Sequence, residues 1–213
     1  MSFASGHPNV SERARITELE AKLRNRGMNS AELLELALLN LEPLHDGFRA
    51  VELLGKIQPE DPRYALAKLW LAYTYIYELL DEVALRNAMK LVDQLIEEEG
   101  ASVEVKAAAF LLKAAAVREL GVGDTDPAEY VRASIALAPG WIANRQLLAR
   151  IHQERGEQAA AEEELLKAIE ACGQQPEAKN IVDQMFESLV TARGSHRIAD
   201  RLREQLSELQ QES

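Results

Sequence analysis

The sequence is poor in the residues that build disulfides, sheets and metal centres. Its one cysteine, Cys172, excludes an intramolecular disulfide framework and a cysteine-rich zinc site. Aromatic residues make up only 5% of the 213 residues, which is few for a β-sandwich or barrel of this size. The histidines lack the spacing of metal ligands, so we expect no metal and no cofactor; they are His7, His45, His152 and His196.

Long apolar runs and targeting signals are also missing. Charged residues interrupt every hydrophobic stretch before it reaches the roughly eighteen residues of a membrane span. The first residues show no basic segment followed by an apolar run, which argues against a secretory signal. Together with the free thiol, these features lead us to expect a cytoplasmic protein without membrane insertion.

Positive charge is scarce. The chain has 24 Lys and Arg against 35 Asp and Glu, a net charge of −11, and no Lys/Arg cluster. Such a charge repels phosphate backbones, so we expect no nucleic-acid partner. No Ser/His/Asp set or carboxylate pair stands out either, which predicts a protein that is not an enzyme.

The chain is rich in Ala, Leu, Glu, Arg and Gln, which are strong helix formers, and this predicts an all-α fold. Helix starts are marked by Asn29 with Glu32, by Ser102, and by the Asp-Pro pairs at 61–62 and 126–127; Gln175-Pro176 marks another less clearly. Glycines separate many apolar-periodic segments. The predicted helices are 11–26, 30–42, 47–58, 62–80, 83–99, 103–120, 127–138, 141–155, 158–172, 177–193 and 196–210.

A repeat of 34 to 39 residues runs through these helices. In the second helix of successive hairpins a small residue is followed, four and seven positions later, by two residues expected to face the core. The four sets are Ala50, Leu54 and Ile57; Ala88, Val92 and Leu95; Pro127, Val131 and Ser134; and Ala161, Leu165 and Ala168. One first helix carries an aromatic stripe at spacings 0, 3, 4 and 7, formed by Trp70, Tyr73, Thr74 and Tyr77.

This pattern resembles the tetratricopeptide repeat, a helix–turn–helix unit with aromatic residues on helix A and small residues on helix B. Segment 142–173 matches best in length but has Arg145 and His152 where aromatic residues are expected. The resemblance implies a right-handed α-solenoid of about four to five antiparallel hairpins with capping helices at both ends. We expect one helical-repeat domain over 1–213, with 1–10 flexible, an N-terminal helix at 11–28, hairpins over 29–195 and a capping helix at 196–213.

The resemblance also implies a concave groove lined by the A helices. In the family's register the groove residues are Glu35, Lys68, Leu71, Tyr75, Glu78, Leu111, Arg118, Gln146 and Arg150. They predict an acidic N-terminal end, an apolar middle and an arginine-bearing C-terminal end. The opposing interpretation is that Leu71 and Leu111 belong to the core and that the charges only solvate the surface. The Trp70 stripe fits intra-repeat packing better than a ligand platform.

These features predict a non-enzymatic adaptor or scaffold that binds a peptide or partner protein in the groove. An alternative is a cognate inhibitor or chaperone of a basic protein, of the toxin-immunity or secretion-chaperone type, because acidic charge speeds association with a basic partner. A second alternative is a regulator that senses a small ligand. The terminal helices could also mediate a homo-oligomer. Glu97–Glu99 and Glu162–Glu164 are expected to be solvated, and Cys172 to be a buried apolar residue.

Overall fold

All regular secondary structure that can be described is helical. A computed structural model of the chain describes residues 9–25, 27–41, 44–121, 126–172 and 195–211, and every regular element in these ranges is a helix. The predicted all-α class is confirmed. The chain divides into two compact units, Met1–Ala101 and Ser102–Ser213.

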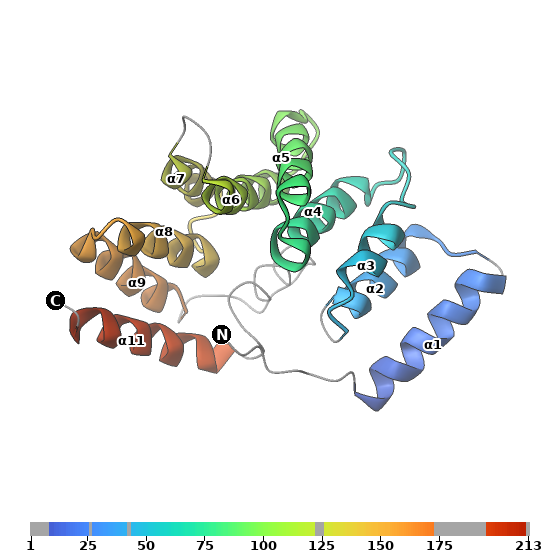
Figure 1. Cartoon of the computed structure of the whole chain (residues 1–213), viewed down its shortest axis with the longest axis horizontal. Helices are drawn as coiled ribbons and strands as arrows, with labels where there is room; N and C mark the ends of the chain where they lie inside the picture. Colours follow the sequence, from blue (N-terminus) through green and yellow to red (C-terminus); the bar gives the residue numbers. More distant parts are fainter. Residues whose placement is uncertain (1–8, 26, 42–43, 122–125, 173–194, 212–213) are drawn as a thin grey trace. The chain divides into compact units, whose positions relative to one another are not determined.

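The first unit contains two helical hairpins and an N-terminal helix (Figure 1). Helix α2 packs against α3, and α4 packs against α5, while α3 also contacts α4 and α1 covers α2. The elements are α1 (Val10–Asn25), α2 (Ser30–Leu41), α3 (Gly47–Leu54), α4 (Tyr64–Thr74), the π-helix η1 (Tyr75–Leu79) and α5 (Glu82–Glu97).

The second unit repeats the hairpin arrangement and ends in a long helix. Helix α6 packs against α7 and α8 against α9, α7 contacts α8, and α11 lies on α9. The elements are α6 (Val103–Leu120), α7 (Pro127–Leu137), α8 (Ile142–Glu154), α9 (Gln158–Cys172) and α11 (Ser195–Gln211). The helix predicted at 177–193 and its start at Gln175-Pro176 lie outside the described residues.

Local sequence signals explain most helix boundaries. Asn29 and Glu32 form a reciprocal capping box, in which each side chain accepts a hydrogen bond from the other residue's backbone N–H at 3.0 and 3.1 Å. Ser102 and Asp126 accept hydrogen bonds from the first turns of α6 and α7 at 3.3 and 2.8 Å. Gly121 ends α6 with a left-handed backbone (φ 60°), a conformation that glycine adopts without strain.

The predicted helix 62–80 differs from the structure at both ends. Its first turn begins at Tyr64, because Asp61 accepts a hydrogen bond from the backbone N–H of Arg63 at 2.8 Å and so closes a turn before the helix. At Tyr75 the chain changes to a π-helix, which places more residues in each turn than an α-helix. The π-helix ends before Leu80, whose backbone is left-handed, with a φ of 57°.

The small residues of the repeat lie at buried helix contacts. The relative exposure is 6% or less at Ala50, Leu54, Ile57, Ala88, Val92, Leu95, Val131, Ser134, Ala161, Leu165 and Ala168. Pro127 is the exception: it opens α7 and is partly exposed, and its neighbour Ala128 is fully buried in its place. The predicted core of the B helices is therefore confirmed at every position except Pro127, where Ala128 takes the buried place.

Gly47, at the start of α3, marks a close approach between the two hairpins of the first unit. A Cβ placed on it would lie 2.9 Å from the Glu78 Cβ and 3.3 Å from the Thr74 Cγ2. A side chain at this position would force α3 away from η1, so only glycine allows the observed packing.

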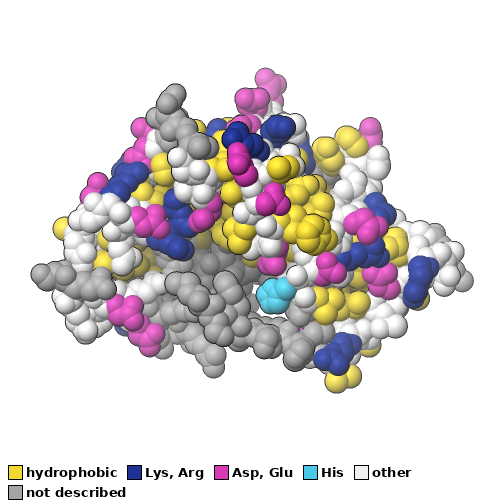
Figure 2. Space-filling model, in the orientation of Figure 1, with side chains coloured by type: hydrophobic (Ala, Val, Ile, Leu, Met, Phe, Trp, Pro, Cys, Tyr) yellow, Lys and Arg dark blue, Asp and Glu magenta, His cyan; other side chains and the backbone are white. Residues whose placement is uncertain are grey.

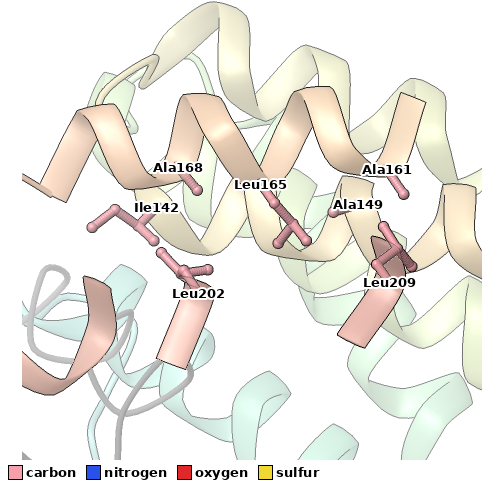
Figure 3. Close-up of a cluster of buried hydrophobic side chains, with 7 residues drawn as sticks. All are labelled: Ile142, Ala149, Ala161, Leu165, Ala168, Leu202 and Leu209. Carbon is pink, nitrogen blue, oxygen red and sulfur yellow. The ribbon is translucent and has the colours of Figure 1, made fainter. Parts of the chain in front are cut away.

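The terminal helix α11 covers the last described hairpin. Its side chains Leu202 and Leu209 are 0% and 2% exposed, and they join Ala161, Leu165 and Ala168 of α9 in one apolar cluster with Ile142 and Ala149 of α8. Figure 3 shows the two leucines pointing toward α9. Leu206 packs at the edge of the cluster. A helix with one apolar stripe thus covers the end of the apolar core.

The buried position of Ala161 gives a direct test of the packing. We expect Ala161→Asp to lower the free energy of unfolding by about 3 kcal/mol or more, because it would bury an unpaired carboxylate in a filled site. Ala159→Asp is the matched control, since Ala159 lies on the same helix and is exposed. Its effect should stay within about 0.5 kcal/mol. Urea denaturation followed by circular dichroism measures both, and equal effects would contradict the packing of α9.

Candidate functional site

Lys68, which was predicted to face the groove, is a buried residue of α4. It is 6% exposed, and its Nζ donates a hydrogen bond to Glu98 Oε2 at 2.9 Å. The same ammonium lies 5.0 Å from the centre of the Tyr64 ring. Lys68 therefore joins α4 to the end of α5, and Glu98 of the predicted acidic run serves as its partner rather than as a free surface charge.

Leu71 and Tyr75 lie four residues apart in α4 and η1 and are both partly exposed. Trp70 beside them is only 2% exposed and meets Tyr73 edge to face, with the ring centres 5.3 Å apart. The Tyr73 ring in turn lies 5.0 Å from that of Tyr77. The aromatic stripe is thus held by ring contacts within the hairpin, as the sequence suggested, although Tyr77 at its end is 37% exposed. Leu71 and Tyr75 face a different direction. Figure 2 shows hydrophobic side chains gathered over α4 and α5, with acidic side chains beside them.

Glu78 lies one turn beyond Tyr75 and is largely buried. Its side chain is 20% exposed and sits 3.8 Å from the His45 Nδ1. Burial raises the pKa of Glu78, and the nearby His45 only partly offsets this effect. His45 has a left-handed backbone, with φ of 51°. Glu78, which was predicted to line the groove, is therefore a carboxylate held close to the protein interior.

Glu35 serves to attach α1 to α2. Arg15 donates two hydrogen bonds to its carboxylate, from Nε and Nη2, each at 2.7 Å. These bonds hold the pKa of Glu35 below its usual value. Because both carboxylate oxygens accept bonds from α1, the structure uses Glu35 for the docking of the N-terminal helix.

In the second unit, the predicted residues fall into different environments. Leu111 is 2% exposed and belongs to the core, so it presents no surface for a partner. Arg118 of α6 is mostly covered, and its Nη1 lies 3.5 Å from Glu154 Oε1. Arg150 of α8 is exposed and pairs with the same oxygen at 3.3 Å. Gln146 is partly exposed. Glu154 thus brings the two arginines together, while Gln146 and Arg150 reach solvent.

Polar contacts replace the aromatic residues that the hairpin α8–α9 lacks. Arg145 donates a hydrogen bond to Glu164 at 2.8 Å, and Lys167 bonds the same carboxylate at 2.9 Å. Burial acts to raise the pKa of Glu164, but these two hydrogen bonds outweigh it and the pKa is lowered. His152 is 9% exposed and pairs with Glu157. The expectation that Glu164 is part of a solvated acidic run is therefore wrong.

A buried polar contact joins three helices of the second unit. Ser134 of α7 donates its hydroxyl hydrogen to the Ala107 carbonyl at 2.7 Å, and its oxygen lies 3.0 Å from Asn144 Oδ1. Both side chains are fully buried. Sequence reasoning placed Ser134 in the core but missed Asn144. The signal that could have found it is a single amide side chain on a helix face that is otherwise apolar.

The described ranges hold no group of three or more His, Cys, Asp and Glu side chains arranged to bind a metal ion. Within those ranges, no helix is long and apolar enough to cross a bilayer. The side chains of Cys172, His7 and His196 lie outside the described part of the chain.

Comparisons with known proteins identify the fold. No protein-family model matches the sequence, and no curated protein is similar to it in sequence. A solved structure described as "Crystal structure of MamA" is 20% identical and covers 82% of this chain and 98% of its own, with a TM-score of 0.57. Another, "MamA RS-1 ArsTM double mutant", is 16% identical and covers 78% of this chain and 88% of its own, also with a TM-score of 0.57.

Both matches have a tetratricopeptide-like helical-repeat fold, and this chain shares it. The predicted solenoid class is thereby confirmed. At these identities the likeness concerns the fold.

The raised pKa of Glu78 predicts that removing its charge makes the protein more stable, by an amount that depends on pH. Because the folded-state pKa lies above the unfolded value, the charged carboxylate opposes folding at neutral pH, and this opposition disappears when both states are protonated. We expect Glu78→Gln to be more stable than the parent at pH 7 and to lose that advantage near pH 4. Urea titrations at both pH values measure the difference. A destabilised variant at pH 7 would show that the contact with His45 dominates.

Proposed function

We propose that the protein is an interaction module whose first unit binds a peptide segment of a partner protein on the exposed side of α4 and η1. The observation that carries this proposal is the pair Leu71 and Tyr75, which are partly exposed above a packed layer containing Trp70 and Lys68. Side chains four residues apart on a helix lie on one face, so a single bound segment can contact both.

The chemistry of this face suits a peptide rather than a small charged ligand. Tyr75 combines an apolar ring with a hydroxyl that can donate or accept a hydrogen bond, a combination enriched at protein interfaces. Leu71 adds apolar area. The ammonium of Lys68 is already bonded to Glu98. The charged group next along the helix from Tyr75 is the carboxylate of Glu78. A segment with an apolar anchor and a donor or cation next to it would satisfy these groups.

The fold comparison supports this proposal, because helical-repeat proteins present extended surfaces of parallel A helices. In the second unit, the corresponding helix α8 carries Gln146 and Arg150, which offer polar contacts rather than apolar anchors. We infer that binding energy is concentrated on α4 and η1, since a few apolar or aromatic anchors commonly dominate an interface. The proposed role is binding without catalysis.

Photo-crosslinking from Tyr75 tests where a partner binds. A photoreactive phenylalanine analogue replaces Tyr75 in one variant and Tyr130 in another, and crosslinked proteins are identified by mass spectrometry from cells that produce the protein. Tyr130 is the matched control, because it is a partly exposed tyrosine on the B helix α7. We expect the variant at position 75 to crosslink a specific partner, and we expect the variant at position 130 not to crosslink that partner.

The affinity of that partner should then depend on the tyrosine ring. Tyr75→Ala should weaken binding by about 2 kcal/mol or more, as truncation of an interface anchor commonly does, while Tyr130→Ala should not. Trp70→Ala should instead lower stability by about 3–5 kcal/mol, because Trp70 is buried. Calorimetric titration and thermal melts separate the two effects. Full affinity in a folded Tyr75→Ala protein would refute the proposed site.

A further inference from the structure

Exposed hydrophobic side chains collect where the α2–α3 connection meets the turn between η1 and α5. Phe48 is 79% exposed, Val83 69%, Leu80 56% and Leu44 41%. A single exposed apolar residue is ordinary, but four exposed apolar residues in two short segments that adjoin are of the kind that marks an interaction site. We call these four residues the Phe48 surface.

Two contacts hold these segments together in space. A Cβ on Gly47 would lie 2.9 Å from the Glu78 Cβ and 3.4 Å from the Leu79 Cδ2, so the residue before Phe48 lies close to the side chains of the two residues before Leu80. On the other side of Gly47, His45 Nδ1 lies 3.8 Å from Glu78 Oε2. The segments 44–48 and 77–83 therefore adjoin where α3 begins and η1 ends.

The charges around this surface are mostly negative. Arg49, next to Phe48, is engaged by the carboxylates of Glu20 and Glu52. Segments 44–48 and 77–83 contain four carboxylates, Asp46, Glu78, Asp81 and Glu82, and no Lys or Arg. Asp46 and Asp81 are the N-cap residues of α3 and α5. They accept hydrogen bonds from backbone N–H groups at 2.9 and 2.8 Å, and both residues are exposed. Glu82 pairs with the exposed Arg86 one turn later, and Glu78 lies beside His45.

We propose that the Phe48 surface docks a basic segment of a partner protein, in which an apolar side chain is flanked by Lys or Arg. The apolar side chain would cover Phe48 and Leu80, and the flanking cations would face the carboxylates. Pairing with a second copy of this chain would set like charges against each other, and phosphate groups would be repelled in the same way. This inference does not rest on the proposed site at Tyr75.

A designed peptide provides the probe. A fluorescent twelve-residue peptide of Lys and Leu is titrated against the full chain by fluorescence anisotropy, alongside one peptide with Glu in place of Lys and one with Ser in place of Leu. Both substituted peptides should bind at least about tenfold more weakly, because the surface needs charge and apolar area together. NMR shifts of the labelled protein should change at 44–48 and 77–83.

Paired variants distinguish binding at the Phe48 surface from attraction by the overall negative charge of the protein. Phe48→Ser combined with Leu80→Ser should weaken the Lys/Leu peptide about tenfold or more, whereas Leu166→Ser, at a 49% exposed leucine of α9, should leave the affinity unchanged. Tyr75→Ala should also leave it unchanged, which distinguishes the two sites. Equal binding by the double variant would overturn the proposal. So would sedimentation showing that the double variant abolishes self-association of the parent, because a second copy would then be the occupant.

Discussion

Close contact between helices at small residues is the constraint on which both units depend. A 30-residue hairpin cannot bury its apolar face alone, and helices approach closely only where side chains are small. Ala50, Ala88, Ala128 and Ala161, near the start of each B helix, are all at most 1% exposed. At Gly47 the approach is so close that a methyl group would collide with η1. The exposed faces of α4 and α5 are positioned by these contacts.

Ion pairs take over where apolar packing is thin. Arg15 bonds Glu35 and Arg49 bonds Glu20, which attach α1 to α2 and α3 although α1 buries only Leu19 completely. In the second unit Glu164 accepts bonds from two cations in place of aromatic packing. Each exposed pair contributes modestly, about 1 kcal/mol or less, so the pairs chiefly fix position. These pairs also involve several charged side chains that, from the sequence alone, could be expected to bind a partner.

The fold could be predicted from the sequence because its signals are local. Ser102 and Asp126 cap their helices as expected, and the repeat of small residues identified the buried faces of α3, α5, α7 and α9 except at Pro127. The surface was harder to predict because side-chain pairing is a long-range property. Lys68 and Glu98 are 30 residues apart, and nothing in either segment shows that they meet. The π-helix at Tyr75, which shifts the register toward Glu78, has no sequence signal that we recognise.

The most direct test of the account is the cost of enlarging one small residue at a helix contact. Ala88→Leu on α5 should lower the free energy of unfolding of the first unit by about 1–3 kcal/mol, because the site has no room for three more carbons. Lys90→Leu, at an exposed position of the same helix, should change it by no more than about 0.5 kcal/mol. Urea unfolding followed by the fluorescence of Trp70, in a Trp141→Phe background, measures both variants. Equal stabilities for the two would contradict the claim that close helix contact organises the fold.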